Sequence, residues 1–183
     1  MAGKIYTKRG DKGSSRQMDG KFISKSDPQI LAVGALDEAQ SWLGIVIADL
    51  TAAGAELKPE LVRIQRKLYY VQADISIAER STITEEDVTR LESEIDRMMG
   101  AVEQIHAFIL PGGGHTGAQL QYARTLARRA ERACVMFHEE KPERVKPEGL
   151  KFINRLSDYL YAMARYANYL DHVPEVLSKD EDE

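Results

Sequence analysis

Apolar residues recur at helical spacing along most of this chain, and only short connections separate the segments that carry the pattern. Side chains three and four positions apart lie on one face of an α-helix, so each segment presents an apolar stripe that must be covered. Five such segments run over 28–50, 61–78, 84–100, 116–138 and 148–170. Five amphipathic helices joined by short loops, with almost no strand pattern, predict an all-α five-helix bundle.

Cap and turn residues mark where these helices begin and end. Asp27 is suited to the N-cap of the first helix, and Pro28 is suited to its first turn. Thr84 is followed by three acidic residues, which is typical of a helix start and predicts the beginning of the third helix. The glycines at 112–114 form the strongest break in the chain, and the fourth helix follows them directly.

These signals divide the chain into three parts. Residues 1–27 hold glycines and many charges without an apolar period, so we expect an ordered glycine-rich loop there, with a brief strand at Ile5–Thr7. Residues 28–172 form the helix-bundle domain. Residues 173–183 form an acidic C-terminal tail, and we expect Ser178 to Glu183 to be disordered.

Composition excludes several classes of protein. The chain carries 25 Lys and Arg against 29 Asp and Glu, and this net charge of −4 argues against nucleic-acid binding through bulk charge. Its single cysteine allows no intrachain disulfide, as in a reducing compartment. The first residues lack the apolar region of a secretory signal, and the most apolar run, 42–50, is too short to cross a bilayer. We therefore expect a cytoplasmic protein that binds neither nucleic acid nor membrane.

The N-terminal segment 6–15 combines the features of a polyphosphate-binding loop. Glycines at 10 and 13 let the backbone approach a ligand closely, and its N–H groups can form an anion nest. Lys8, Arg9 and Lys12 add positive charge, while Thr7 and the serines at 14 and 15 add hydroxyl donors. The spacing is not that of a Walker A loop, and a flexible basic N-terminus would have the same composition.

The fourth helix carries a cluster of arginines. Arg124, Arg128 and Glu131 are spaced four and three residues apart, so they share one helix face. Alanines at 123, 127 and 130 permit close approach of a helix or a ligand. A solvated charged face would show the same spacing. Against that alternative, the arginines are grouped beside alanines rather than alternating with acids, and the helix follows a glycine loop able to close over a ligand.

The final helix has a polar face beside its apolar stripe, formed by Asn154, Asp158, Tyr161 and Arg165. Asparagine is a mediocre helix former, which favours a ligand contact for Asn154. A polar contact between helices explains the same residues equally well.

Other titratable residues give weaker indications. Asp37 lies between apolar turns of the first helix; if it is buried it needs a cationic partner, for which Arg124 is the candidate, and otherwise it is an exposed acid. The histidines at 106, 115, 138 and 172 and Cys134 show no metal-ligand spacing, so we expect no metal site built from protein ligands.

Three ordered stretches resemble the PduO-type ATP:cob(I)alamin adenosyltransferases. They are residues 5–13 (Ile-Tyr-Thr-Lys-Arg-Gly-Asp-Lys-Gly), residues 108–113 (Phe-Ile-Leu-Pro-Gly-Gly) with 123–132, and residues 152–160. Leu36-Asp-Glu with Ser41 in the first helix fits as well. The resemblance extends from about residue 5 to about residue 170, and the sequence departs from the family pattern at Arg9, over 14–20 and over 114–117.

The resemblance implies a five-helix bundle that assembles as a homotrimer, with active sites between adjacent subunits. The residues implied to hold ATP from the N-terminal part are Thr7, Lys8, Arg9, Gly10, Lys12, Gly13, Ser15, Arg16 and Lys25. Those implied from the bundle are Arg128, Arg129, Glu131, Arg132 and Asn154, with Asp37 and Arg124 as an ion pair across the subunit boundary and Phe108 closing the lower face of the corrin. Among these, Arg128, Glu131, Asn154, Arg124 and Asp37 are expected to act in catalysis.

The implied reaction transfers the 5′-deoxyadenosyl group of ATP to the cobalt of cob(I)alamin and releases triphosphate. Mg²⁺ is expected to accompany ATP, and a reductase and an adenosylcobalamin-dependent enzyme are expected as further partners. Three alternatives stay open from the residues alone. They are a bundle that binds ATP or adenosylcobalamin and delivers it without catalysis, a structural helical protein, and a kinase-like enzyme that releases ADP.

Overall fold

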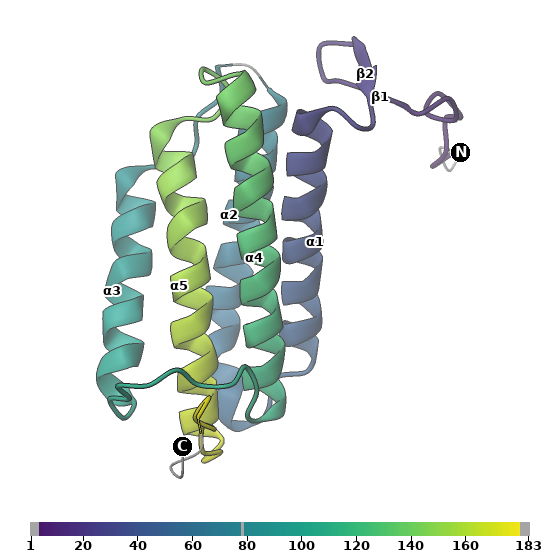
Figure 1. Ribbon diagram of the computed structural model, residues 1–183. Coiled ribbons are helices and arrows are strands. Elements are labelled where there is room, and N and C mark those ends of the chain that lie inside the picture. The colour runs from purple at the N-terminus through teal and green to yellow at the C-terminus, as the bar shows by residue number, and fades with distance from the viewer. Residues whose placement is uncertain (1–3, 78, 180–183) are drawn as a thin grey trace.

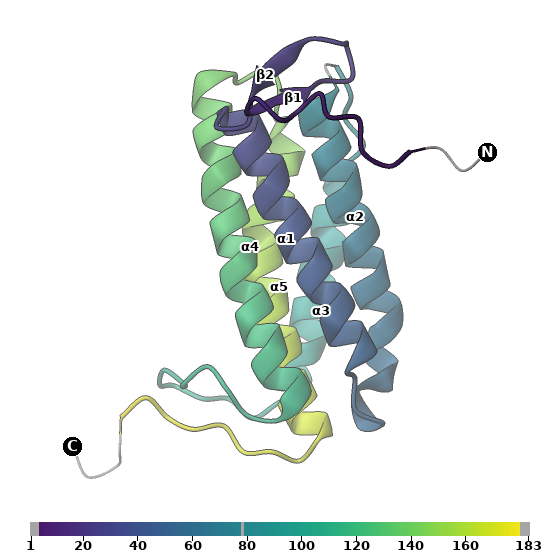
Figure 2. The same ribbon diagram turned by 90° about the vertical axis from the view of Figure 1, so that its right-hand side faces the viewer.

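The computed structural model describes residues 4–77 and 79–179, and its main body is an antiparallel bundle of α-helices (Figures 1 and 2). The helices are α1 (Pro28–Ala48), α2 (Lys58–Ser76), α3 (Glu85–Ala101), α4 (His115–Glu140) and α5 (Pro147–Leu170), with a short 3-10 helix, η1 (Ala53–Leu57), before α2. Helices α1, α3 and α5 run in one direction and α2 and α4 run in the other (Figure 1). The prediction of an all-α bundle with five helices is confirmed for this part of the chain.

Helix α5 is the most buried element of the bundle. It packs against α4 on one side and α3 on the other, while α1 packs against α4 and α2. Side chains such as Phe152 and Tyr159 of α5 and Leu36 of α1 are wholly buried in the shared core. The alanines at 123, 127 and 130 are also buried, so these small side chains serve the close approach of helices within the chain.

The predicted helix starts are confirmed at α1 and α3. The Asp27 side chain accepts a hydrogen bond of 2.9 Å from the backbone N–H of Gln29, with Pro28 in the first turn. At α3, Thr84 and Asp87 form a reciprocal capping box, which satisfies backbone N–H groups that have no partner within the helix.

Several predicted boundaries were wrong by a few residues. Helix α2 ends at Ser76, because Ile77 turns to an extended backbone; Ala78, expected at the end of this helix, lies outside the described residues. Helix α4 begins at His115 and ends at Glu140, one and two residues beyond its expected bounds. Such end residues carry little periodic signal.

The expected strand at Ile5–Thr7 is wrong, and a hairpin occurs later in the N-terminal segment. Strands β1 (Ser14–Arg16) and β2 (Phe22–Ser24) pair antiparallel, while Ile5–Thr7 is irregular. The connection turns at Asp19-Gly20, where Gly20 has φ +89° and the Asp19 side chain accepts from the N–H of Lys21 at 3.0 Å. An Asp-Gly pair is a common hairpin signal, so this turn was readable from the sequence.

Helix α1 is long and apolar enough to span a membrane by length and composition, which corrects the expectation that the apolar runs are too short. Its buried residues, which include Leu36, Leu43 and Val46, instead contribute to the bundle core beside α2 and α4. A core helix of a bundle meets the same criterion, so we assign α1 to the core.

The two ends of the bundle carry different attachments. The hairpin and the residues before it lie at the end where α1 begins, and residues 4–13 project away from the helices in both views (Figures 1 and 2). The connection 102–114 and the segment after α5 lie together at the opposite end. Helix α4 runs the length of the bundle, so it is the connection 102–114, and not α4, that lies far from the N-terminal segment of the same chain.

Candidate active site

The N-terminal segment encloses a hollow of about 330 Å³ whose lining matches the predicted polyphosphate loop. The lining residues are Thr7, Arg9, Gly10, Ser14, Ser15, Arg16 and Lys25. Six of them were predicted to bind ATP, and Ser14 had been noted only as a hydroxyl donor. Lys8, Lys12 and Gly13 belong to the same loop but do not line the hollow. The segment therefore gathers hydroxyl groups, a glycine backbone and cations around one small space.

Glycine makes this loop geometry available. Gly13 has φ +79°, a conformation that favours glycine, and its carbonyl accepts a 2.9 Å hydrogen bond from the N–H of Lys25. That bond brings Lys25, which follows β2, back to the loop. A Cβ on Gly10 would lie 3.1 Å from the Ser14 carbonyl oxygen and 3.3 Å from Lys25 Nζ, so a side chain there would push the loop and the lysine apart.

The segment is strongly cationic in an otherwise acidic chain. Residues 4–27 carry seven Lys and Arg against three Asp, whereas the whole chain has a net charge of −4. Among the described residues, the ion pair of this segment joins Lys21 to Asp19, at 3.5 Å, and none joins the cations at 8, 9, 12, 16 or 25 to a carboxylate. Cations held close together without acidic partners favour a multiply charged anion.

The second group of predicted residues lies on α4 and α5, which pack against each other. Arg128 and Arg132 are exposed on α4, and Asn154 on α5 donates a 2.6 Å hydrogen bond to the Glu131 carboxylate. The polar contact between helices that was the alternative for Asn154 therefore exists, and it also fixes the direction of Glu131. Arg129 pairs instead with Glu38 of α1. Arg128 and Arg132 are thus displayed beside an ordered carboxylate–amide pair.

Asp37 and Arg124 do not form an ion pair within the part of the chain that the structure describes. Asp37 is exposed on α1, and Arg124 Nε donates instead to Gln121 Oε1 of its own helix at 2.9 Å. Asp37 is therefore the exposed acid of the alternative, and the condition under which it would need Arg124 within one protomer is not met. The pairing across a subunit boundary stays a prediction, and an exposed Asp37 is available for it.

Arg165 was expected on the polar face with Asn154, and this expectation is wrong. Arg165 is 4% exposed, and its guanidinium binds both carboxylate oxygens of Glu175, at 3.0 and 2.8 Å from Nε. Helical periodicity gave its direction around α5, but a partner in the segment after the helix has no periodic signal.

Phe108 lies on the connection between α3 and α4 and is 86% exposed. Its carbonyl accepts a 2.8 Å hydrogen bond from the N–H of Ser178, and the following Ile109 forms an isolated antiparallel bridge with Leu177. The exposed ring on this ordered backbone is available for contact with an apolar ligand. This loop lies at the end of the bundle opposite the N-terminal hollow (Figures 1 and 2), so one chain does not bring the two together.

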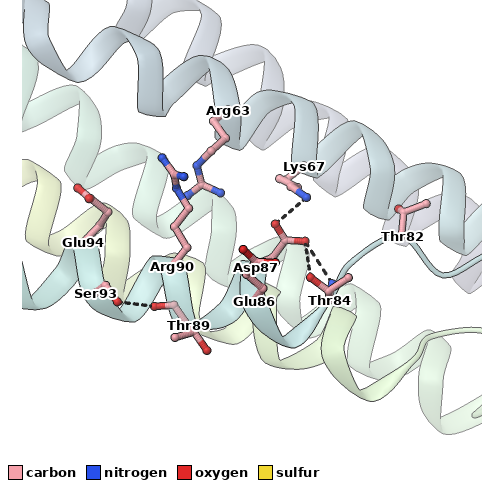
Figure 3. A pocket seen from close by; sticks show the side chains of 10 residues that line it. All are labelled: Arg63, Lys67, Thr82, Thr84, Glu86, Asp87, Thr89, Arg90, Ser93 and Glu94. Atoms are coloured by element: carbon pink, nitrogen blue, oxygen red, sulfur yellow. Dashed lines mark hydrogen bonds and ion pairs between the residues drawn. The ribbon is translucent and has the colours of Figure 1, made fainter.

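A larger hollow, about 650 Å³, lies elsewhere, between α2 and α3. Figure 3 shows Arg63 and Lys67 of α2 facing Asp87 and Arg90 of α3 across it. The cations already have acidic partners: Lys67 lies 2.6 Å from Asp87, and Glu60 binds both Arg63, at 2.7 Å, and Arg90, at 2.5 Å. We therefore regard this groove as a structural ion-pair surface, since its charges are largely neutralised from within.

The contacts across this groove lower the pKa of the Asp87 carboxyl. Burial alone would raise the pKa of its carboxyl, but the hydrogen bonds from Lys67 and from the backbone N–H of Thr84 outweigh burial, and the pKa is lowered. The carboxylate thus stays charged and ties the start of α3 to α2.

No cluster of three or more His, Cys, Asp or Glu suited to a metal ion occurs within residues 4–77 and 79–179. Cys134 is wholly buried, and burial raises the pKa of its thiol to about 12, so it is protonated at neutral pH and unsuited to nucleophilic attack.

Comparison with known proteins gives a consistent family. The family model for cobalamin adenosyltransferase matches residues 5–167. A corrinoid adenosyltransferase from Bacillus subtilis is 36% identical over 178 residues, which cover 94% of this chain and 91% of that protein. The corrinoid adenosyltransferase PduO of Salmonella typhimurium is 40% identical over 167 residues, which cover 88% of this chain. The chain spans about half the length of that relative (48%) and of the Citrobacter freundii PduO protein (53%).

Solved structures agree with this grouping. A phenylalanine-to-alanine variant of a PduO-type ATP:corrinoid adenosyltransferase from Lactobacillus reuteri, complexed with cobalamin and ATP, superposes with a TM-score of 0.91 and 37% identity, covering 97% of this chain and all of that one. An arginine-to-lysine variant from the same organism, complexed with ATP, superposes with a TM-score of 0.90 and 39% identity over 96% of this chain. Because the family model, the relatives and the fold agree over nearly the whole described length, this chain belongs to the cobalamin adenosyltransferase family, with the PduO-type enzymes as its relatives.

Proposed function

We propose that this protein transfers the 5′-deoxyadenosyl group of ATP to the cobalt of cob(I)alamin, giving adenosylcobalamin and triphosphate. The observation that carries the proposal is the hollow of the N-terminal segment, where hydroxyl groups, Gly10 and three cations without acidic partners surround one space. Triphosphate is both part of the substrate and the leaving group of this reaction. A site that binds it and stabilises it as it departs serves both steps.

Cob(I)alamin is the nucleophile and attacks C5′ of ATP, so the Co–C bond forms as the C–O bond to triphosphate breaks. The chain then needs no nucleophile of its own, which agrees with the inert Cys134. Its contributions are alignment of the two substrates, worth up to roughly 7–11 kcal/mol, and stabilisation of the negative charge that grows on the leaving oxygen. We assign charge stabilisation to Arg128 and Arg132 and to the N-terminal cations, while Asn154 orients Glu131.

Mg²⁺ is proposed to accompany ATP and to be held mainly by phosphate oxygens, because Mg²⁺ keeps several water ligands and takes few protein carboxylates. Glu131 is the carboxylate beside the arginines of α4, and Asn154 occupies one of its oxygens. These residues fit a water-mediated contact to the ion better than a dedicated cage.

We place the active site between protomers of a homotrimer. The N-terminal segment projects away from its own bundle (Figures 1 and 2), so its hollow is presented to a neighbour. The exposed Asp37 on α1 is proposed to pair with Arg124 of the adjacent protomer. A cytoplasmic location, an electron-donating reductase and an adenosylcobalamin-dependent enzyme that receives the product complete the proposal.

Phe108 is proposed to close the lower face of the corrin, where its exposed ring would exclude water and the lower cobalt ligand. In the Lactobacillus reuteri relative, the substituted phenylalanine and arginine are twenty positions apart, as Phe108 and Arg128 are in this chain. This spacing supports the assignment of both residues.

The test combines the protein with ATP, Mg²⁺ and chemically reduced cobalamin under anaerobic conditions. We expect a light-sensitive alkylcobalt product, followed by absorbance, and one triphosphate released for each product. Binding of ATP and cobalamin without product would instead indicate a delivery module, and release of ADP would indicate a kinase-like reaction; either result would overturn the proposal.

A further inference from the structure

Two polar side chains are buried on the last two turns of α5, at the end of the bundle that carries the connection 102–114. Arg165 is 4% exposed and Asn168 is 2% exposed. Burial of a charge or an amide is unfavourable unless its hydrogen bonds are satisfied, so the partners of these two residues reveal what they hold. All of the partners described below lie in the connection 102–114 or in the segment after α5.

Arg165 joins these two segments directly. Its Nε lies 3.0 and 2.8 Å from the two carboxylate oxygens of Glu175, and its second terminal nitrogen donates to the carbonyl of Glu103 at 2.8 Å. The carboxylate of Glu175 is itself largely buried, with 12% of the side chain exposed. Removal of one partner of such a buried pair is strongly unfavourable, because it leaves the other charge buried without compensation.

Asn168 holds the glycine turn before α4. Its amide nitrogen donates to the Gly112 carbonyl at 3.2 Å, and its oxygen accepts from the Gly114 N–H at 3.0 Å. Gly113 has φ +106°, and a Cβ on Gly113 or Gly117 would collide with the Asn168 side chain. The sequence departs from the family pattern over 114–117, and these residues lie at or next to the contact between Asn168 of α5 and the glycine turn.

Between these two anchors, the loop pairs with the segment after α5. The N–H of Leu110 donates to the Val176 carbonyl at 2.8 Å, and the N–H of Ser178 donates to the Phe108 carbonyl at 2.8 Å. The Phe108 backbone is therefore fixed on both sides while its ring stays 86% exposed. An exposed loop without such bonds would sample many conformations, and ordering it on ligand binding would weaken affinity.

We propose that Arg165, Glu175 and Asn168 are positioning residues that act through Phe108: they clasp residues 173–178 onto the loop and hold the ring ready for the corrin. This inference rests on the proposed function, because it assigns cobalamin to Phe108. The segment after α5 is then part of the cobalamin site although it carries none of the predicted site residues.

The first test measures cobalamin binding, which does not depend on turnover. Glu175→Gln keeps the size of the side chain but leaves the Arg165 charge uncompensated. With ATP present, titration with cob(II)alamin followed by absorbance should give a dissociation constant raised about tenfold or more, with ATP affinity unchanged. Amide exchange at Leu110 and Ser178 should accelerate. Glu92→Gln is the matched control, since it breaks an exposed ion pair with Arg155 and should change none of these quantities.

A double-mutant cycle separates positioning from a general loss of structure. If Glu175 acts through the ring, Glu175→Gln should weaken cob(II)alamin binding by less than twofold once Phe108→Ala is present. Additive effects, or an unchanged dissociation constant in Glu175→Gln, would overturn the clasp. A wild-type protein that binds cobalamin without transferring adenosyl would overturn only the proposed function, whereas failure to bind cobalamin would overturn both.

Discussion

Arg128 carries the sharpest prediction for a single side chain. It is exposed on α4, one turn before the ordered Glu131–Asn154 pair, so it is available to an incoming phosphate chain. Arg128→Ala should lower kcat by about a hundredfold or more, as loss of a preorganised charge-stabilising donor does. Steady-state rates of triphosphate release measure this. Arg155→Ala removes an arginine of α5 that is already paired with Glu92 of α3, and it should leave kcat within about twofold. Equal effects of the two substitutions would remove Arg128 from the site.

Gly117 allows a prediction of how one added methyl group changes the free energy of unfolding. It lies in the first turn of α4, where an added Cβ would overlap the buried Asn168 side chain. Gly117→Ala should therefore lower the free energy of unfolding by about 1–3 kcal/mol, the usual cost of overpacking. Gly100 in α3 has open space at the same atom, so Gly100→Ala should stabilise the protein by about 0.5–1 kcal/mol. Chemical denaturation of both variants measures the difference, and a neutral Gly117→Ala would contradict the packing.

For single residues, the composition of the N-terminal segment was a better guide than helical periodicity. Composition indicated the residues that line the hollow, whereas periodicity did not identify the contacts of Arg165 and Asn168. Glycines, hydroxyl groups and cations close in sequence lie close in space, so local composition indicated the lining of the hollow. Arg165 was assigned to the wrong surroundings because its partner, Glu175, follows the helix in an irregular segment. Asn168 was not predicted to have a role. It is a single polar residue beside the apolar stripe of α5, and only its hydrogen bonds to the loop show what it does.

Among the elements, helices were predictable because each contains several turns of one repeating pattern. The hairpin β1–β2 was missed because its strands have three residues each, too few to show an alternation. Only the Asp19-Gly20 turn could have indicated it. The pairing of residues 108–110 with 176–178 joins segments far apart in sequence, and such contacts leave no local signal.

The start of α3 provides a prediction about pH. The lowered pKa of Asp87 means that its contacts with Lys67 and Thr84 stabilise the fold above the unfolded-state pKa of about 3.9 and are lost as pH falls through the lower folded-state pKa. Asp87→Asn should therefore reduce the free energy of unfolding by about 1–2 kcal/mol near pH 6. The difference from wild type should begin to shrink below about pH 4, where the Asp87 carboxyl of the unfolded state binds a proton. It should stop shrinking only below the lower folded-state pKa, where the native carboxylate is protonated as well.

Urea denaturation at several pH values measures this difference. The other carboxylates are the same in both proteins, so their contributions to the pH dependence of unfolding cancel in the difference. Asp96→Asn is the control, because Asp96 is exposed on the same helix and has no hydrogen bond or ion pair among the described residues. A gap between wild type and Asp87→Asn that persists unchanged at pH 3 would show that shape rather than charge matters at this cap.

Across the whole molecule, α1 and α4 present a surface that suits another protomer. Leu31 and Ile45 of α1 and Tyr122 and Met136 of α4 are each about half exposed. Each pair is fourteen residues apart, four helical turns, so its members lie on one face. The Glu38–Arg129 ion pair joins the two helices between them. A mixed apolar and charged face of this kind is typical of subunit interfaces, and Asp37 lies beside it.

The proposed site between protomers of a homotrimer makes a prediction that no single-chain site can satisfy. Gly10→Val should disable the N-terminal hollow, because its side chain would displace Lys25 and the Ser14 backbone, whereas Arg128→Ala should disable the α4 surface. Each homotrimer alone should be nearly inactive. In trimers assembled by co-expressing both chains with different tags, some sites combine the intact hollow of one protomer with the intact helix of the next.

Random assembly in equal amounts places an intact hollow beside an intact helix in about a quarter of the sites. Selection for both tags removes the two homotrimers, and every remaining trimer has such a boundary at one of its three sites. Doubly tagged trimers, purified and assayed for adenosylcobalamin formation, should therefore recover about a third of wild-type activity. Mixtures of preformed homotrimers that do not exchange subunits should recover none. If hollow and helix served the same chain's site, every site would contain one lesion and activity would stay absent. The recovered fraction thus measures the geometry of the site directly, because only a boundary between protomers lets two defective chains supply one complete set of residues.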